Sequence, residues 1–140
     1  MSMRWLGVDP GERRVGIAAC DADERVAVPL EVVPASAAFP AIRSIAAREQ
    51  AGGVVVGLPL SLDGTEGAAA RLARRLGERL ARMTDLAVEY EDERLTSVAA
   101  ERHRGGRAPR DDIAAALMLQ QFIDRRQHAA RADEGADGRP

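Results

Sequence analysis

Three groups of acidic side chains, far apart in the sequence, could together bind divalent cations: Asp9, the cluster Glu91 to Glu93, and the pair Asp111 and Asp112. Carboxylate oxygens are hard ligands that suit Mg²⁺ or Mn²⁺. Two such ions about 3.5–4 Å apart need several shared carboxylates, and together they activate water and stabilise the leaving oxygen when a phosphodiester is cut. The chain has no lysine and only two isolated histidines, so metal-assisted hydrolysis is the chemistry that these residues favour.

Asp9 ends a short apolar segment and is followed by the turn residues Pro10 and Gly11. A carboxylate inside a buried strand costs free energy unless it is paired or binds a metal. Asp before Pro-Gly is also common as the cap of a hairpin turn, and this motif alone leaves both readings open. Gly11 would let a phosphate approach the backbone closely.

The second acidic group stands beside Arg94 at the end of a predicted strand. Alternation along a strand sends Asp92 to one face and both Glu91 and Glu93 to the other. The carboxyl ends of strands are where open α/β sheets place ligands. The alternative is a solvated acidic edge that Arg94 neutralises.

Asp111 and Asp112 precede an alanine-rich apolar segment that starts at Ile113. One acid here has a plain structural role, because it can cap a helix and interact favourably with the helix dipole. Two adjacent acids allow one to cap while the other faces inward. The small residues 114–116 would let this helix lie close to the sheet, so we expect Asp112 to come within a few ångströms of a point shared with Asp9 and the acid of the second group.

The elements that must position these acids follow from the hydrophobic pattern, which has a strand period first and mostly a helix period later. Strands are predicted over 4–9, 15–20, 26–33, 54–58 and 86–90, and helices over 38–50, after Gly67, over 96–103 and from 113 to about 126. Helices between later strands imply right-handed crossovers and a parallel half of the sheet. We therefore predict an α/β fold with a mixed five-stranded sheet and helices on both faces. The domain is expected to span 1–126, with a disordered tail over 127–140.

The composition limits the class of partner. The formal net charge is −2 and aromatic residues make up 3% of the chain, which argues against a uniformly basic nucleic-acid binder and against a dedicated single-strand binder with many stacking rings. Any nucleic-acid surface must therefore be local. A single cysteine, Cys20, and the absence of a visible signal peptide or membrane span predict a cytoplasmic protein with no membrane partner.

Nucleic-acid contacts are expected around the acids. The loop after strand 54–58 could contact phosphates through its backbone and hydroxyl groups, although an ordinary connecting loop explains it equally well. The arginines of segment 104–110 could guide nucleic acid by phosphate contacts, or simply belong to a solvated, mobile loop. The predicted nucleic-acid-binding residues are Gly11, Arg13, Asp63, Thr65, Arg94, Arg104, Arg107 and Arg110.

Four motifs in order resemble the YqgF/RuvX family: Gly-Val-Asp-Pro-Gly with Val-Gly-Ile-Ala, then Val-Val-Val-Gly-Leu-Pro, then Asp-Glu-Arg-Leu-Thr-Ser, and finally Asp112 before an alanine-rich helix. They extend from about residue 3 to residue 124. The resemblance implies a ribonuclease H-like fold related to RuvC-type junction resolvases, and a nuclease that matures the 5′ end of pre-16S rRNA in ribosome biogenesis. Carried over by position, the catalytic and metal-binding acids are Asp9, Glu93 and Asp112, with Asp92 as the alternative to Glu93.

Two other functions stay open from the sequence. The same site could resolve Holliday junctions in branched DNA, which requires a two-fold assembly, and the chain could be a monomer or a homodimer. Alternatively, the chain could be a non-catalytic module that binds nucleic acid or the ribosome. In that case the Asp9 carboxylate would be dispensable.

Overall fold

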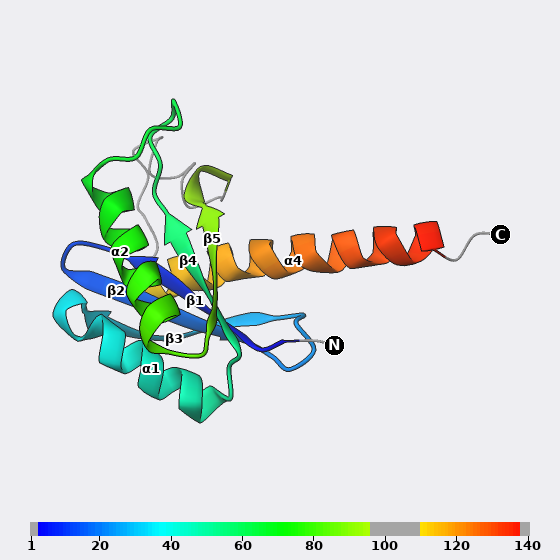
Figure 1. Cartoon of the computed structure of the whole chain (residues 1–140), viewed down its shortest axis with the longest axis horizontal. Helices are drawn as coiled ribbons and strands as arrows, with labels where there is room; N and C mark the ends of the chain where they lie inside the picture. The colour runs from blue at the N-terminus through cyan, green and yellow to red at the C-terminus, as the bar shows by residue number, and fades with distance from the viewer. Residues whose placement is uncertain (1–2, 96–109, 138–140) are drawn as a thin grey trace.

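The computed structural model describes residues 3–95 and 110–137 of the 140-residue chain (Figure 1). Within that part, a five-stranded sheet has the order β3-β2-β1-β4-β5. The strands are β1 (Trp5–Pro10), β2 (Arg14–Cys20), β3 (Ala27–Pro34), β4 (Gly53–Leu58) and β5 (Ala87–Asp92). The helices are α1 (Ala38–Glu49), α2 (Ala68–Met83) and α4 (Asp111–Asp137), with short 3-10 turns η1 (Ala35–Ala37) and η2 (Glu93–Leu95). The predicted α/β class is confirmed.

The sheet is mixed, as the sequence pattern predicted. The hairpin strands β1, β2 and β3 pair antiparallel, whereas β4 pairs parallel with both β1 and β5. Parallel neighbours need a crossover connection, and α1 and α2 supply these crossovers. Because β1 and β4 run in the same direction, their carboxyl ends meet at one edge of the sheet. We call this the carboxyl edge.

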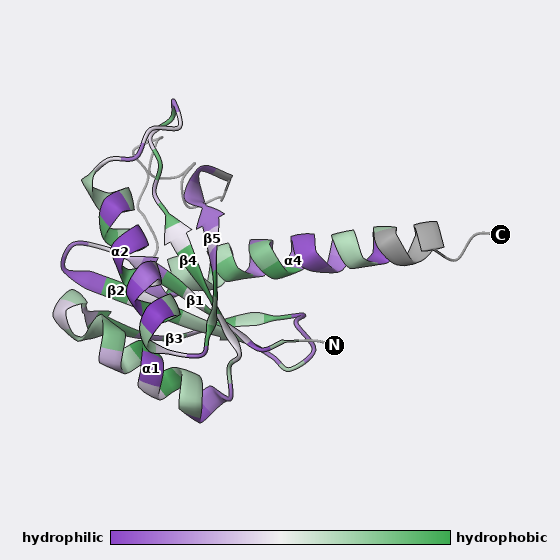
Figure 2. Ribbon diagram, viewed as in Figure 1, coloured by the Kyte–Doolittle hydropathy of each residue, from purple (hydrophilic) through white to green (hydrophobic). Residues whose placement is uncertain are grey.

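One face of the sheet packs against α1 and α2 through a core of branched aliphatic side chains. Leu6 and Val8 of β1, Ile17 of β2, Ile42 of α1 and Leu80 of α2 are all fully buried there. Figure 2 shows the hydrophobic colour concentrated where the helices meet the strands. Burial of this apolar surface is the main stabilising contribution to the fold.

The opposite face packs against α4 through a second, separate core. Trp5 of β1 meets Phe122 of α4 edge to face, with ring centroids 5.0 Å apart. Small residues such as Ala18 of β2 and Ala115 of α4 fill much of the remaining interface. Because small side chains separate the backbones least, α4 can lie close to β1 and β2.

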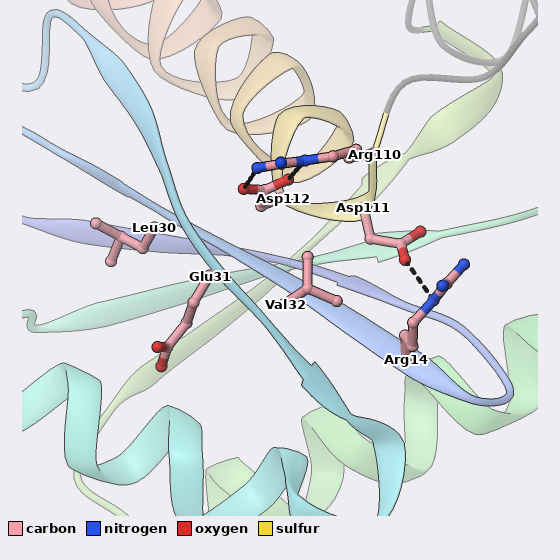
Figure 3. Close-up of a pocket in the computed structure, with 7 residues that line it drawn as sticks. All are labelled: Arg14, Leu30, Glu31, Val32, Arg110, Asp111 and Asp112. Atoms are coloured by element: carbon pink, nitrogen blue, oxygen red, sulfur yellow. Dashed lines mark hydrogen bonds and ion pairs between the residues drawn. The ribbon is translucent and has the colours of Figure 1, made fainter.

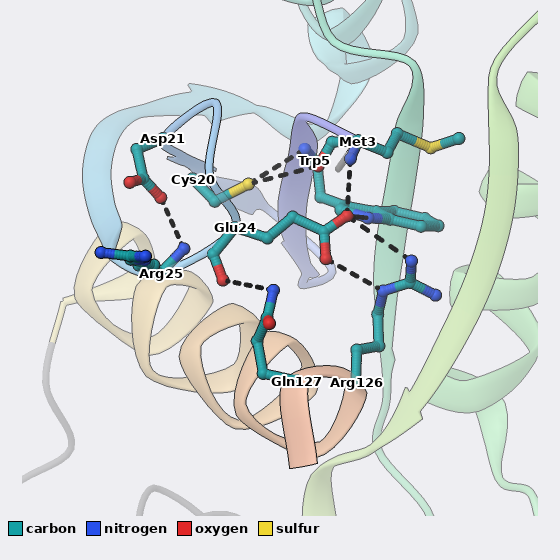
Figure 4. A network of polar contacts seen from close by, with 8 residues as sticks. All are labelled: Met3, Trp5, Cys20, Asp21, Glu24, Arg25, Arg126 and Gln127. Atoms are coloured by element: carbon teal, nitrogen blue, oxygen red, sulfur yellow. Dashed lines mark hydrogen bonds and ion pairs between the residues drawn. The ribbon is translucent and has the colours of Figure 1, made fainter. Parts of the chain in front are cut away.

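Helix α4 is longer than predicted. The sequence pattern placed its end near residue 126 and a disordered tail after it, but the helix continues to Asp137. Glu24, in the turn between β2 and β3, anchors it: its carboxylate accepts hydrogen bonds from Arg126, and its carbonyl oxygen accepts one from Gln127 (Figure 4). Alanine and arginine, which dominate residues 129–132, are also strong helix formers, so composition alone misjudged this segment.

Two further predictions concern the segment between η2 and α4. The predicted helix over 96–103 and nearly all of the loop over 104–110, including Arg104 and Arg107, lie outside the described residues. Among the helices that are described, none is long and apolar enough to cross a membrane.

Candidate active site

Asp9 lies on the α4 face of the sheet, at the carboxyl edge. Trp5, four residues earlier on β1, packs in the α4 core, and residues an even number of positions apart share a face of a strand. Asp9 pairs across the hairpin with Gly16 of β2. Its exposed fraction is 5%, so this carboxylate is held away from bulk water.

Glu93 reaches the same face from the end of β5. Val8 of β1 pairs with Val56 of β4, so Gly57 follows directly beside Asp9. The Oε1 atom of Glu93 lies over Gly57, where an added Cβ would approach it to 2.5 Å. The missing side chain at position 57 therefore leaves the space that the Glu93 carboxylate fills, one strand away from Asp9.

Asp112 reaches this face from the first turn of α4. The backbone of Asp111 and Asp112 crosses directly over Gly16, where a Cβ would overlap the Asp111 carbonyl and lie 2.6 Å from the Asp112 nitrogen. Gly16 is the residue that pairs with Asp9. Two glycines on β2 and β4, one on each side of Asp9, thus admit the start of α4 and the Glu93 side chain.

The three predicted acids therefore gather on one face and one edge, and all are buried. Their exposed fractions are 5% for Asp9, 8% for Glu93 and 4% for Asp112. However, across residues 3–95 and 110–137, no three His, Cys, Asp or Glu side chains are close enough together to bind one metal ion. The expected convergence on a common point is therefore not reached in this structure.

An arginine holds the Asp112 carboxylate. Arg110 donates from Nε to Oδ1 at 3.2 Å and from Nη2 to Oδ2 at 2.9 Å (Figure 3). This hydrogen-bonded guanidinium keeps the pKa of Asp112 below its ordinary value. The Asp112 side chain is only 5% exposed while that of Arg110 is 75% exposed, so the arginine covers the carboxylate from the solvent side and could leave without disturbing the core.

Arg14 makes a similar pair with the neighbouring acid. Its Nε atom lies 3.2 Å from Oδ2 of Asp111. Both pairs line a cavity of about 400 Å³ between the start of α4 and strands β2 and β3. The two adjacent acids thus have different surroundings, with Asp112 buried and Asp111 partly exposed.

Asp92 and Glu93 lie in different surroundings, which bears on the choice between them. Asp92 receives hydrogen bonds from the backbone and the guanidinium of Arg94, and this arginine lowers the pKa of Asp92. Arg94 also donates to the carbonyls of Ser61 and Leu62. Asp92 and Arg94 therefore fasten the loop after β4, whereas Glu93 lies over Gly57 on the α4 face.

Glu91 is a buried acid whose role the sequence pattern did not reveal. It is 1% exposed and pairs in register with Gly57. Gln121 and Arg125 of α4 both donate to its carboxylate. These contacts are consistent with the predicted alternation, in which Asp92 faces one way and Glu91 and Glu93 face the other. That Glu91 holds helix α4 in place follows only from the packing of α4 against β5.

Of the predicted nucleic-acid-binding residues, those in the described part of the chain lie in the loops after β1, β4 and β5 and at the start of α4. Gly11 closes the β1–β2 turn by donating to the Arg14 carbonyl, and Arg13 is exposed beside it. Asp63 accepts hydrogen bonds from the backbone and hydroxyl of Thr65 in the exposed loop after β4. These hydrogen bonds give Gly11 and Asp63 structural roles in the turns to which they belong.

Comparison with known proteins identifies the family. The family model described as "RuvX: Holliday junction resolvase" matches residues 3–125. The chain belongs to the RuvX family. The chain is 46% identical over 135 residues to an Anaeromyxobacter protein, covering 89% of this chain and 98% of that one, and 41% identical to a Chloroflexus aggregans protein, covering 88% and 94%. Both relatives carry the name "Putative pre-16S rRNA nuclease". This RuvX chain is thus an enzyme of a nuclease family.

Two solved structures share the fold of this chain. RuvC of Thermus thermophilus in complex with a Holliday junction substrate matches with a TM-score of 0.59 at 20% identity, covering 89% of this chain and 96% of that one. A second RuvC structure from the same organism matches with a TM-score of 0.57 at 18% identity, covering 90% and 97%. At this level of identity the likeness concerns the fold, which is ribonuclease H-like, as predicted.

Proposed function

We propose that this RuvX chain is a metal-dependent endonuclease that hydrolyses phosphodiesters, with Asp9, Glu93 and Asp112 as its metal-binding and catalytic acids. The observation that carries the proposal is the burial of these three carboxylates on one face, at one edge, from three separate elements. Carboxylates buried together repel one another, and divalent cations between them remove that repulsion.

The donor set fits Mg²⁺ or Mn²⁺, with two ions as the expected number. All three donors are carboxylates, and Gly16 and Gly57 leave the space beside Asp9 free of their own side chains. When bound, such ions would supply an activated water and charge stabilisation of the leaving oxygen. The chain itself contributes the three acids, whose burial keeps bulk water away from the site. To bind an ion together with the other two, the Asp112 carboxylate must turn away from Arg110.

The proposed substrate is the precursor of 16S rRNA, cut near its 5′ end during ribosome biogenesis. The names of the relatives, which match nearly the whole chain, support this choice. The ribosome or its assembly intermediate is then a partner, and the cytoplasm is the expected location. Nucleic-acid contacts by Gly11, Arg13, Asp63, Thr65, Arg94, Arg104, Arg107 and Arg110 remain part of the proposal.

A cleavage assay tests the proposal. Purified chain with Mg²⁺ or Mn²⁺ should cut a 16S rRNA precursor near its 5′ end, and Asp9→Asn should abolish cutting because it removes a charged metal ligand. Asp85→Asn, an exposed acid at the opposite end of β5, is the matched control and should cut normally. Full activity in Asp9→Asn, after contaminating nucleases are excluded, would reject the proposal. Rescue of cell growth by Asp9→Asn would instead favour a non-catalytic binding module.

Resolution of Holliday junctions is the second candidate. The family description and the fold shared with RuvC favour it. Paired symmetric nicks demand a two-fold dimer, so the candidate predicts dimers in sedimentation equilibrium and cutting of a synthetic four-way junction. A monomer that ignores the junction but cuts the RNA precursor removes it.

A further inference from the structure

Helix α2 carries a dense run of positive charge that the proposed active site does not use. Its sixteen residues include five arginines and one glutamate, and α1 beside it has two arginines and one glutamate. The whole chain has a formal net charge of −2, whereas α2, with five arginines and one glutamate, has a net charge of +4. We define the arginine stripe of α2 as Arg71, Arg75, Arg79 and Arg82.

The arginine stripe faces solvent. Ala70, Ala73, Gly77 and Leu80 form the buried side of α2, and the four stripe residues recur at intervals of four, four and three positions on the other side. All four are exposed. In Figure 2 the outer side of α2 accordingly has the hydrophilic colour. At about 1.5 Å of rise per residue, the stripe is roughly 16 Å long.

This arrangement lowers the stability of the helix instead of raising it. Arginines at i and i+4, as at 71 and 75 or 75 and 79, repel one another. Positive charge near a helix N-terminus is also unfavourable, yet the first turn of α2 has no acid and its N-cap, Gly67, makes no side-chain cap. By contrast, α4 begins with two acids. The charge pattern of α2 thus lowers helix stability in a way that α4 avoids, and such a departure from local stability points to a function.

Intramolecular contacts account for only part of the charge. Arg74, beside the stripe, pairs with Glu66, and Arg79 lies over the ring of Phe39, 4.0 Å from its centroid. Arg82 is in the last turn, where positive charge suits the helix dipole. For Arg71 the partner is a backbone carbonyl, that of Glu66. In the described part of the chain, Arg75 has no hydrogen bond or ion pair.

The arginine stripe begins at the same edge of the sheet as the candidate active site. Helix α2 connects the carboxyl end of β4 to the start of β5, and these two strands are parallel. The N-terminus of α2 therefore lies at the carboxyl edge, where Leu72 and Leu76 line a small cavity with Pro10 and Gly11, and the stripe runs away from that edge along the face opposite α4. The loop 59–67, which is exposed from Ser61 onward, joins β4 to α2.

We propose that the arginine stripe of α2 binds the sugar-phosphate backbone of the nucleic acid whose phosphodiester reaches the active site. The proposal rests on the proposed function for the identity of that ligand. Guanidinium groups bind phosphate oxygens through two parallel hydrogen bonds, and a row of them suits a repeating anion better than it suits a single small one. Binding here would hold the strand on the far side of the carboxyl edge while another part of it is cut.

The test compares two double variants of the full chain by fluorescence anisotropy. Arg71→Gln/Arg75→Gln removes two stripe charges. Arg25→Gln/Arg131→Gln removes two exposed arginines from the β2–β3 turn and from α4, with the same change in net charge. The probes are a labelled duplex-containing RNA from the 5′ end of a 16S precursor and a labelled four-way DNA junction. A chelator is present, so the readout does not depend on cleavage and separates failure here from failure of the proposed nuclease.

The stripe variant should reduce the slope of log K against log salt by about 1.4–1.8, the amount expected for two lost phosphate contacts, and should weaken binding at 0.1 M salt at least about tenfold. The control should match the wild type. A change with RNA alone assigns the stripe to RNA, and a change with the junction alone assigns it to DNA. If both probes bind the stripe variant and the control equally, the proposal is wrong and an acidic protein surface becomes the better occupant.

Folding is checked in the same samples. Because the substitutions remove like-charge repulsion, the Tm of the stripe variant should be unchanged or higher. If the double variant folds poorly, Arg75→Gln alone repeats the test, with about half the change in slope. An unchanged slope in that single variant would also overturn the proposal.

Discussion

The two faces of the sheet are built from different kinds of residue. The face under α1 and α2 is lined with large aliphatic side chains, such as Leu6, Ile17 and Leu80, all fully buried. The face under α4 has glycine or alanine at many of the corresponding positions, and it carries the buried acids Asp9, Glu91, Glu93 and Asp112. The first face maximises the buried apolar area, and the second lets α4 and the acidic side chains lie close to the strands.

The difference separates stability from chemistry. Aliphatic packing provides most of the free energy that holds the strands together, so the α4 face can tolerate glycines and charged groups that contribute less. Gly16 and Gly57 show what is gained, because each leaves room for a different acid-bearing segment beside Asp9. Changes on the first face should therefore alter stability, and changes on the second should alter the site.

The largest effect on stability is expected for Leu80→Ala. Leu80 is fully buried between α2 and the sheet, and removing a buried leucine costs about 2–5 kcal/mol because of lost burial and the cavity left behind. Equilibrium urea unfolding measures the loss. Mn²⁺ affinity of the folded protein should be unchanged, and a large fall in that affinity would mean that the two faces are not independent.

Gly16→Ala should have a smaller effect on stability and a large effect on the site. The new Cβ would overlap the Asp111 carbonyl, so the first turn of α4 must move, at a cost of about 1–3 kcal/mol. We expect cleavage and Mn²⁺ binding to be lost. Gly67→Ala is the matched control, since nothing lies within 4 Å of a Cβ there. Normal Mn²⁺ binding in Gly16→Ala would show that the position of α4 does not matter for the site.

The smallest effect is expected at the edge of the site. Arg110→Gln removes the guanidinium that occupies the Asp112 carboxylate, and because this arginine is mostly exposed, we expect Mn²⁺ affinity to rise only about two- to fivefold. Titration calorimetry measures it. Arg14→Gln, which loses a pair with Asp111 instead, controls for the general change in charge. An equal gain in both variants would mean that Arg110 does not compete for Asp112.

Local sequence patterns predicted the elements, because period and turn residues are properties of short segments. They marked three groups of acids, and the resemblance to the family selected Asp9, Glu93 and Asp112 among them. They did not predict the roles of Gly16 and Gly57, since these depend on which residues pair across strands and on where α4 crosses the sheet. The burial of Glu24 and Glu91 depends likewise on partners about 30 to 100 residues away. The end of α4 was missed because the composition of this segment predicted a disordered tail, although the alanines and arginine of residues 129–132 favour helix. The contacts of Glu24 with Arg126 and Gln127, at the point where the predicted tail begins, are invisible in that composition.

The account depends most on whether Asp9, Glu93 and Asp112 share divalent cations. An anomalous-difference map from a crystal soaked in Mn²⁺ tests this directly. We predict at least one peak within bonding distance, roughly 2.0–2.6 Å, of carboxylate oxygens from these three residues, with Asp112 turned away from Arg110. A map with no peak there, or with Mn²⁺ only at exposed acids such as Asp63, would contradict the account.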